Sequence, residues 1–295
     1  MRRISSIARA TAVEILGEPL SLLLLLAAAV VAVLSPVFHF HQFGEVTRMS
    51  RDAAFSAQFM FGTAFAVFCT IKSVRREIES GTMDMALAHS VSRAEFFLAK
   101  CAGAFAAYLL FASVVFFIAV IMVDGAAVGG AVADKTGDVA RIWGVAAAAA
   151  MAVPVLSLVV SAFVNYFARR RFTLMSSLLM AAMAPVAATA VSVLVRDVSC
   201  PVRMLPVACL LVVPAALNVA CAAAFSMRFK ANISASLSFA AVALSIPFVG
   251  NYFMSEALSK GGEVSWGYVA LAFAAALPAL AAFLLVGISF ARRGE

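Results

Sequence analysis

The sequence predicts an all-α integral membrane protein with about eight transmembrane helices. Of the 295 residues, 64% are hydrophobic and only 13% are charged, and the mean hydropathy is +1.04. A soluble domain carries about a quarter charged residues. The apolar stretches are about 20 residues long, enough to cross a bilayer. They are continuous rather than alternating, which predicts helices instead of a barrel.

The N-terminal segment, 1–19, predicts a helix lying on the membrane surface. Its apolar side chains share one helical face: Ile4, Ile7, Ala8, Thr11 and Ile15. A helix with one apolar and one basic face favours the interface between water and lipid. A frayed basic tail is the alternative. A cleavable signal is not expected, because the polar lead runs to Pro19 and the apolar run after it exceeds a signal-peptide core.

Eight spans are expected along the chain, and 1–295 is expected to form one transmembrane domain. The spans are 20–38, 53–71, 101–123, 142–167, 172–195, 204–226, 233–254 and 266–290. Within 172–226 the apolar pattern contains four prolines, at Pro185, Pro201, Pro206 and Pro214. One piece of that stretch is therefore open to a re-entrant interpretation.

The distribution of basic residues predicts the orientation. With the N-terminus inside, 15 of the 22 lysines and arginines fall on inner segments and 7 on outer ones. The positive-inside rule then favours cytoplasmic termini and a cytoplasmic loop at 72–100, with 124–141 as an outer loop. Because the basic residues flank apolar runs instead of clustering on a soluble domain, nucleic acid is not expected as a partner.

Several kinds of chemistry are excluded or weakly supported. The expected spans hold no Asp, Glu, Lys, Arg or His in their interiors, which argues against a proton relay. Sodium coupling through carbonyls and hydroxyls stays open. No GxxxxGK[ST] phosphate loop is present, so the chain is not expected to hydrolyse ATP by that route. His39 and His41 supply too few ligands for a metal, and no CxxC occurs.

A few uncharged polar side chains fall within or near the expected spans. They are Gln58, Asn165, Thr189, Ser192 and Asn218. We expect most of them to hydrogen-bond to neighbouring helices. Contact with a substrate is the alternative, and the sequence does not identify the substrate.

The cytoplasmic segment 72–100 predicts three short helical pieces. Lys72–Ser80 extends the second span, and Gly81 supplies its C-terminal stop. Thr82 can cap a middle piece, on which Met83 and Leu87 share an apolar face. Such a face suits docking into a groove on a partner, and the alternative is a loop helix folded onto its own protein.

The third piece begins with an S-x-x-E capping box formed by Ser92 and Glu95. The whole run, RREIESGTMDMALAHSVSRAEFFLAK, resembles the signature of type-2 ABC exporter permeases. The matching residues are Glu77, Glu79, Gly81, Thr82, Val91, Ser92, Arg93 and Lys100. Ser90 stands where that family usually has proline. The subgroup it most resembles is the permease group associated with multicopper-enzyme maturation.

The resemblance implies a non-catalytic subunit of a transporter in the bacterial inner membrane. Two permease chains would form a dimer, and a separate ABC ATPase subunit would bind ATP and Mg, leaving this chain without a cofactor. The resemblance and the local pattern together assign an ATPase-coupling loop: Arg76, Glu77, Glu79, Gly81, Thr82, Met83, Leu87, Ser92, Arg93, Glu95 and Lys100. The family core has six spans, so eight implies two added spans or a broken pair. A secondary carrier and a membrane-embedded enzyme or assembly factor are the alternatives.

Overall fold

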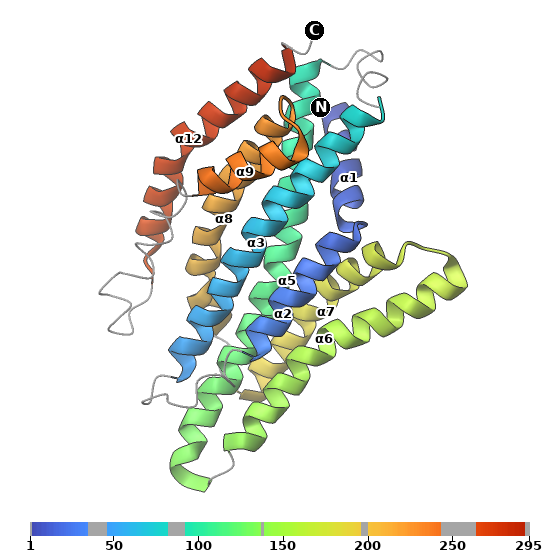
Figure 1. Ribbon diagram of the computed structural model, residues 1–295. Coiled ribbons are helices and arrows are strands. Elements are labelled where there is room, and N and C mark those ends of the chain that lie inside the picture. The colour runs from blue at the N-terminus through green and yellow to red at the C-terminus, as the bar shows by residue number, and fades with distance from the viewer. Residues whose placement is uncertain are drawn as a thin grey trace. The chain divides into compact units, whose positions relative to one another are not determined.

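The computed structural model describes residues 2–34, 46–81, 92–136, 139–195, 200–242 and 264–292. Every regular element in these ranges is an α-helix (Figure 1). In chain order they are α1 (Arg2–Leu16), α2 (Pro19–Leu34), α3 (Val46–Glu79), α5 (Arg93–Thr136), α6 (Val139–Ala168), α7 (Phe172–Val195), α8 (Cys200–Ser226), α9 (Ala231–Val242) and α12 (Trp266–Arg292). The all-α prediction is confirmed for this part of the chain.

Six of the described helices are long and apolar enough to cross a membrane. They are α3, α5, α6, α7, α8 and α12, and α1 with α2 makes a seventh if this bent pair forms one span. The expected span 233–254 is represented by α9, which has 12 residues. Its remainder, 243–254, lies outside the described residues, as does 35–38 of the first expected span.

Two helices run well beyond their apolar stretches. α3 begins at Val46, and α5 covers 44 residues from Arg93 to Thr136. The expected outer loop at 124–141 is therefore wrong: all of it that the structure describes is helical. Its glycines and polar residues lower the hydropathy and so end the apolar run. The segment is also rich in alanine and free of proline, so α5 continues into it as far as Thr136.

The prolines of 172–226 lie inside two separate long helices. Pro185 is in α7, and the other three are in α8. Both helices are long enough to span, so no re-entrant piece appears here. Membrane helices tolerate proline because neighbouring groups and local adjustments satisfy the freed carbonyls.

The chain divides into two compact units, and α3, α5 and α8 contribute residues to both. The first comprises Met1–Leu16, Gly62–Leu109 and Cys209–Glu295. Its core includes Phe97 of α5, which packs with Ala223 and Ala224 of α8 and with Leu284 of α12. Gly287 of α12 lies so close to Phe97 that a Cβ there would be 2.1 Å from the ring.

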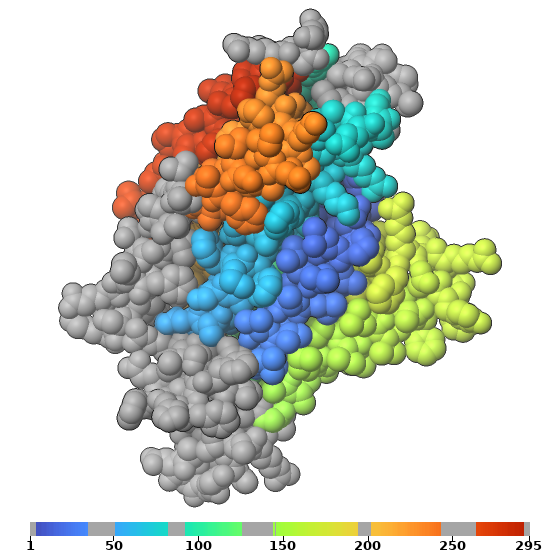
Figure 2. Space-filling model, viewed as in Figure 1, coloured from blue at the N-terminus to red at the C-terminus, as the bar shows by residue number. Residues whose placement is uncertain are grey.

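The second unit comprises Gly17–Phe61 and Leu110–Ala208. Within it α6 and α7 lie side by side and α2 packs against both (Figure 1). The hydroxyl of Thr173, at the start of α7, donates to the Gly17 carbonyl at 2.5 Å. Large apolar side chains such as Phe163 point outward from α6, as expected for a helix facing lipid. The surface of the α6–α7 hairpin is yellow-green in Figure 2.

Candidate functional site

The C-terminal end of α3 has the stop that its sequence predicts. The Ser80 amide donates to the Arg76 carbonyl at 2.9 Å, and the Gly81 amide donates to the Ile78 carbonyl at 3.3 Å. Gly81 has φ +70°, in the left-handed region that a residue with a Cβ rarely adopts. The helix therefore ends at Glu79 with a glycine C-cap.

The start of α5 is fixed by the predicted capping box. The Glu95 amide donates to the Ser92 hydroxyl at 3.2 Å, while a Glu95 carboxylate oxygen accepts from the Ser92 amide at 2.9 Å. Arg93, the first residue of α5, donates to the Ala291 carbonyl of α12 at 3.1 Å. Both sides of the segment joining α3 to α5 are thus anchored. Thr82, Met83 and Leu87 lie outside the described residues, so their apolar docking face stays a prediction.

A buried ion cluster lies next to these two helix ends. Lys100 of α5 is completely buried. Its ammonium lies 2.5 Å from a carboxylate oxygen of Glu77 on α3 and 3.4 Å from one of Glu14 on α1. It also donates to the Ser73 hydroxyl at 3.1 Å, and Ser73 in turn donates to Glu14 at 3.0 Å. We call Glu14, Ser73, Glu77 and Lys100 the three-helix ion cluster.

The charges around this cluster balance. Glu14 and Glu77 face Lys100, and Arg76 lies 3.9 Å from the second carboxylate oxygen of Glu14. A buried ammonium is tolerated only when it is paired and hydrogen-bonded. Ser73 meets the second requirement by accepting from Lys100 while donating to Glu14. Each member therefore depends on the others, and the cluster ties α1, α3 and α5 together.

α1 packs closely against α5 at Gly103. A Cβ at Gly103 would lie 2.4 Å from the Ala8 carbonyl oxygen and 2.6 Å from the Thr11 Cβ. Thr11 and Ile15 are buried. The apolar face of α1 that the sequence assigned to the lipid surface thus packs, at these residues, on the protein itself. A position of α1 on the membrane surface stays a prediction.

The structure brings together some of the predicted coupling residues and separates others. Glu77, Lys100 and, more distantly, Arg76 meet in the ion cluster. Glu79 instead pairs with Arg75 at 2.8 Å, one turn away on α3, and is exposed. An exposed pair of this kind contributes about 0.3–0.5 kcal/mol. Glu79 is therefore not part of the cluster.

Sequence reasoning missed Glu14 and Ser73. One signal for Glu14 was present. At helical spacing it follows Ile7 and Thr11 on the face that is otherwise apolar. A carboxylate on an apolar face needs a buried cation nearby, and Lys100 supplies it. Ser73 carries no such signal, since a serine on a helix is ordinary.

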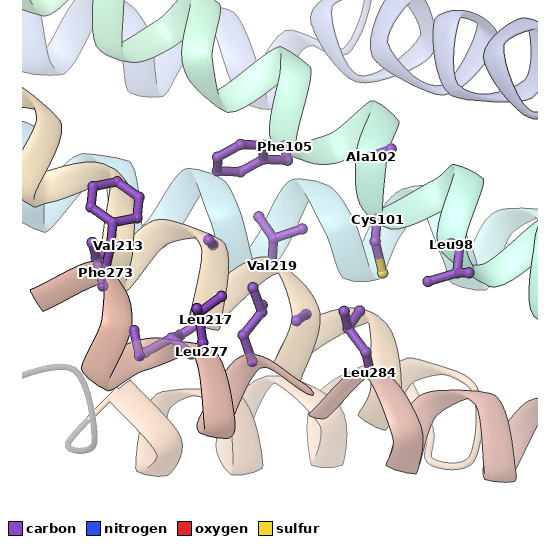
Figure 3. Close-up of a pocket in the computed structure, with 14 residues that line it drawn as sticks. Leu98, Cys101, Ala102, Phe105, Val213, Leu217, Val219, Phe273, Leu277 and Leu284 are labelled. Carbon is purple, nitrogen blue, oxygen red and sulfur yellow. The ribbon is translucent and has the colours of Figure 1, made fainter. Parts of the chain in front are cut away.

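A groove of about 400 Å³ lies between α5, α8 and α12 (Figure 3). Leu98, Cys101 and Phe105 line it from α5, and Leu217, Leu277 and Leu284 line it from the other two helices. All the side chains that line it are apolar. Cys101 faces the groove while its neighbour Lys100 belongs to the ion cluster, so the two features occupy different faces of α5.

A second buried charge lies at Asp124, near the other end of the apolar run of α5. Its side chain is 1% exposed and accepts a 2.5 Å hydrogen bond from Ser192 of α7. The expected span 101–123 holds no charged residue, and the two charged residues that directly flank it, Lys100 and Asp124, are both buried in the protein. A charged residue ends an apolar run in the sequence whether or not neighbouring helices bury it.

The other polar side chains mostly lack partners on neighbouring helices. Thr189 bonds to Val186 of its own helix, and Asn165 caps the end of α6. Gln58 is 1% exposed, and neither its amide nitrogen nor its oxygen has a hydrogen-bond partner among the described residues. The same holds, within that part of the chain, for the buried amide nitrogen of Asn218. Among these five polar residues, the described part of the chain shows a hydrogen bond to a neighbouring helix only for Ser192, which donates to Asp124. Contact with a substrate stays open for Gln58 and Asn218.

Within the residues described, no group of three or more His, Cys, Asp or Glu side chains is placed to hold a metal. Cys101, Cys209 and Cys221 are free thiols. No family model, curated protein sequence or solved structure matches the chain.

Proposed function

We propose that this chain is the membrane-spanning permease subunit of an ATP-binding-cassette transporter, and by its resemblance an exporter. The observation that carries the proposal is the 2.5 Å contact between Glu77 and Lys100. These residues stand near opposite ends of the signature-like run and are 23 positions apart in the sequence. Their contact brings the two described ends of the run together, which supports treating the run as one functional unit.

The ion cluster gives this loop a way to act on the bundle. A displacement of the loop acts directly on the C-terminal end of α3, capped by Gly81, and on the N-terminal end of α5, capped by Ser92 and Glu95. The cluster joins those helices to α1 through buried charge-assisted bonds, which are stronger than neutral ones. The three helix ends therefore respond together. In the proposed complex, a separate ATPase subunit binds ATP and Mg, and its conformational change displaces the loop. Two permease chains form a dimer in the bacterial inner membrane.

Co-purification tests the proposal. The tagged chain, extracted in mild detergent from its own host, should carry with it an ATPase that contains a phosphate loop. Leu87→Asp places an unpaired carboxylate in the contact, where hot-spot anchors contribute about 2 kcal/mol or more, and should abolish co-purification. Leu87→Met keeps the apolar volume and should retain the partner. If no ATPase accompanies the parent chain, or if Leu87→Asp retains it, the proposed coupling contact is wrong.

One observation favours an ion-coupled secondary carrier as a second candidate. Asp124 is a buried carboxylate in a membrane-length helix, and such groups commonly mark ion pathways. In proteoliposomes containing this chain alone, an ion gradient would then drive substrate accumulation, and Asp124→Asn would abolish it. We expect no gradient-driven accumulation from the chain alone, and its appearance would replace the ABC proposal.

A further inference from the structure

The turn between α6 and α7 consists of three consecutive arginines, Arg169, Arg170 and Arg171. All three are exposed. They join two helices that are each long and apolar enough to span a membrane. With both helices crossing a bilayer, a connection of only three residues would place their guanidinium groups at the boundary between hydrocarbon and headgroups.

The backbone of this arginine turn is ordered by its own hydrogen bonds. The Arg169 amide donates to the Asn165 carbonyl at 3.0 Å, and the Asn165 side-chain amide donates to the Arg170 carbonyl at 2.5 Å. Arg169 has φ 50°, in the left-handed region that closes a helix C-terminus. The Arg171 carbonyl then accepts the first bond of α7, from the Met175 amide. The three arginine side chains thus extend from a turn whose backbone conformation is fixed by hydrogen bonds.

None of the three arginines has an ionic partner in the part of the chain that the structure describes. Other basic residues do: Arg51 pairs with Asp52, Arg75 with Glu79, and Lys100 with Glu14 and Glu77. Three adjacent positive charges without a carboxylate repel one another and attract an external anion. Guanidinium groups favour phosphate in particular, because two N–H donors can meet two phosphate oxygens at once.

Two aromatic side chains stand directly before the turn. Tyr166 is 80% exposed and Phe167 is 78% exposed, and their rings meet edge to face with centroids 5.1 Å apart. Exposed aromatic side chains at the end of a span belong at headgroup level, where tyrosine can keep its hydroxyl wet. In Figure 2 side chains at the tip of this yellow-green hairpin project from the surface. Aromatic anchors and unpaired arginines together form a surface suited to lipid headgroups.

We propose that the arginine turn is a binding site for the phosphate headgroups of anionic lipids. The aromatic pair sets the depth of the turn in the interface, and the arginines contact the phosphate. Each arginine that contacts the anionic phosphate contributes about a fivefold gain in affinity, so the three together contribute about a hundredfold. The attraction is electrostatic and should weaken as salt is raised.

The test uses the purified full-length chain in an uncharged detergent. Binding of short-chain phosphatidylglycerol, and of phosphatidylcholine with the same acyl chains, is measured by native mass spectrometry at two salt concentrations. The parent should bind phosphatidylglycerol more tightly, and high salt should reduce the difference. Changing all three arginines to glutamine should lower phosphatidylglycerol affinity by about a hundredfold and leave phosphatidylcholine binding unchanged. Changing all three to lysine keeps the charge but removes the paired N–H donors, so the affinity of this variant for phosphatidylglycerol should lie between those of the parent and the glutamine variant.

The matched control is Arg228→Gln with Lys230→Gln, at the turn between α8 and α9. These two residues are also exposed and have no ionic partner among the described side chains, but they are not consecutive. This variant should change the affinity less than twofold. If this control variant loses as much phosphatidylglycerol affinity per removed charge as the triple glutamine variant does, binding is diffuse electrostatic attraction and the proposed site is wrong. The proposal is also wrong if the triple glutamine variant binds phosphatidylglycerol like the parent. Should that variant aggregate, Arg170→Gln alone must lose about fivefold.

Discussion

Replacing Lys100 with methionine tests whether the three-helix ion cluster holds α1, α3 and α5 together. Methionine keeps most of the side-chain volume, so the change removes the charge and its hydrogen bonds without opening a large cavity. Lys100 loses contacts with Glu77 at 2.5 Å, Ser73 at 3.1 Å and Glu14 at 3.4 Å. The two carboxylates lose the cation that they share, and Arg76 remains 3.9 Å from Glu14.

The structure sets the expected magnitude. Breaking a fully buried ion pair by removing one partner costs about 3–5 kcal/mol. The side chains of Glu14 and Glu77 remain 22% and 26% exposed, so water can reach the orphaned carboxylates. We therefore expect the lower end of that range, about 3 kcal/mol in the free energy of unfolding. Reversible unfolding in mixed micelles of mild detergent and SDS measures it.

A triple variant separates electrostatics from packing. Adding Glu14→Gln and Glu77→Gln to Lys100→Met removes the uncompensated negative charge and should recover more than half of the lost stability. The triple variant should still fail to couple a bound ATPase to the bundle, because the charge-assisted bonds are gone. A loss below about 1 kcal/mol for Lys100→Met would refute the reasoning. So would a triple variant no more stable than the single one.

Two further predictions concern helix seating and orientation. Gly103→Ala should cost about 1–3 kcal/mol of unfolding free energy, because its Cβ would meet the Ala8 carbonyl at 2.4 Å. Gly144→Ala, in α6 with nothing within 4 Å, should be neutral or stabilising in the same assay, and equal effects would contradict the seating of α1 on α5. In a cysteine-free background in intact cells, an impermeant thiol reagent should label a cysteine at Gly137 but not one at Ser90. The reverse pattern would overturn the positive-inside orientation.

The sequence by itself determined the features that depend on lipid and on near neighbours. Apolar length predicts bilayer-spanning helices because the membrane imposes one thickness on every span. The Gly81 stop and the Ser92–Glu95 capping box were also predictable, since each involves residues within one helical turn. The identity of the coupling residues Glu77 and Lys100 came from resemblance, without indicating that they touch.

Only the tertiary structure decided which distant residues meet. Glu14 and Lys100 are 86 positions apart, and Asp124 and Ser192 are 68 apart, so no local pattern pairs them. It also decided how far α5 runs, because hydropathy records how apolar a stretch is and not where the backbone hydrogen bonds end. Burying a charge needs a partner from another helix, and packing selects that partner. The sequence alone therefore places Lys100 and Asp124 at the edges of predicted spans, whereas helix packing buries both side chains inside the protein.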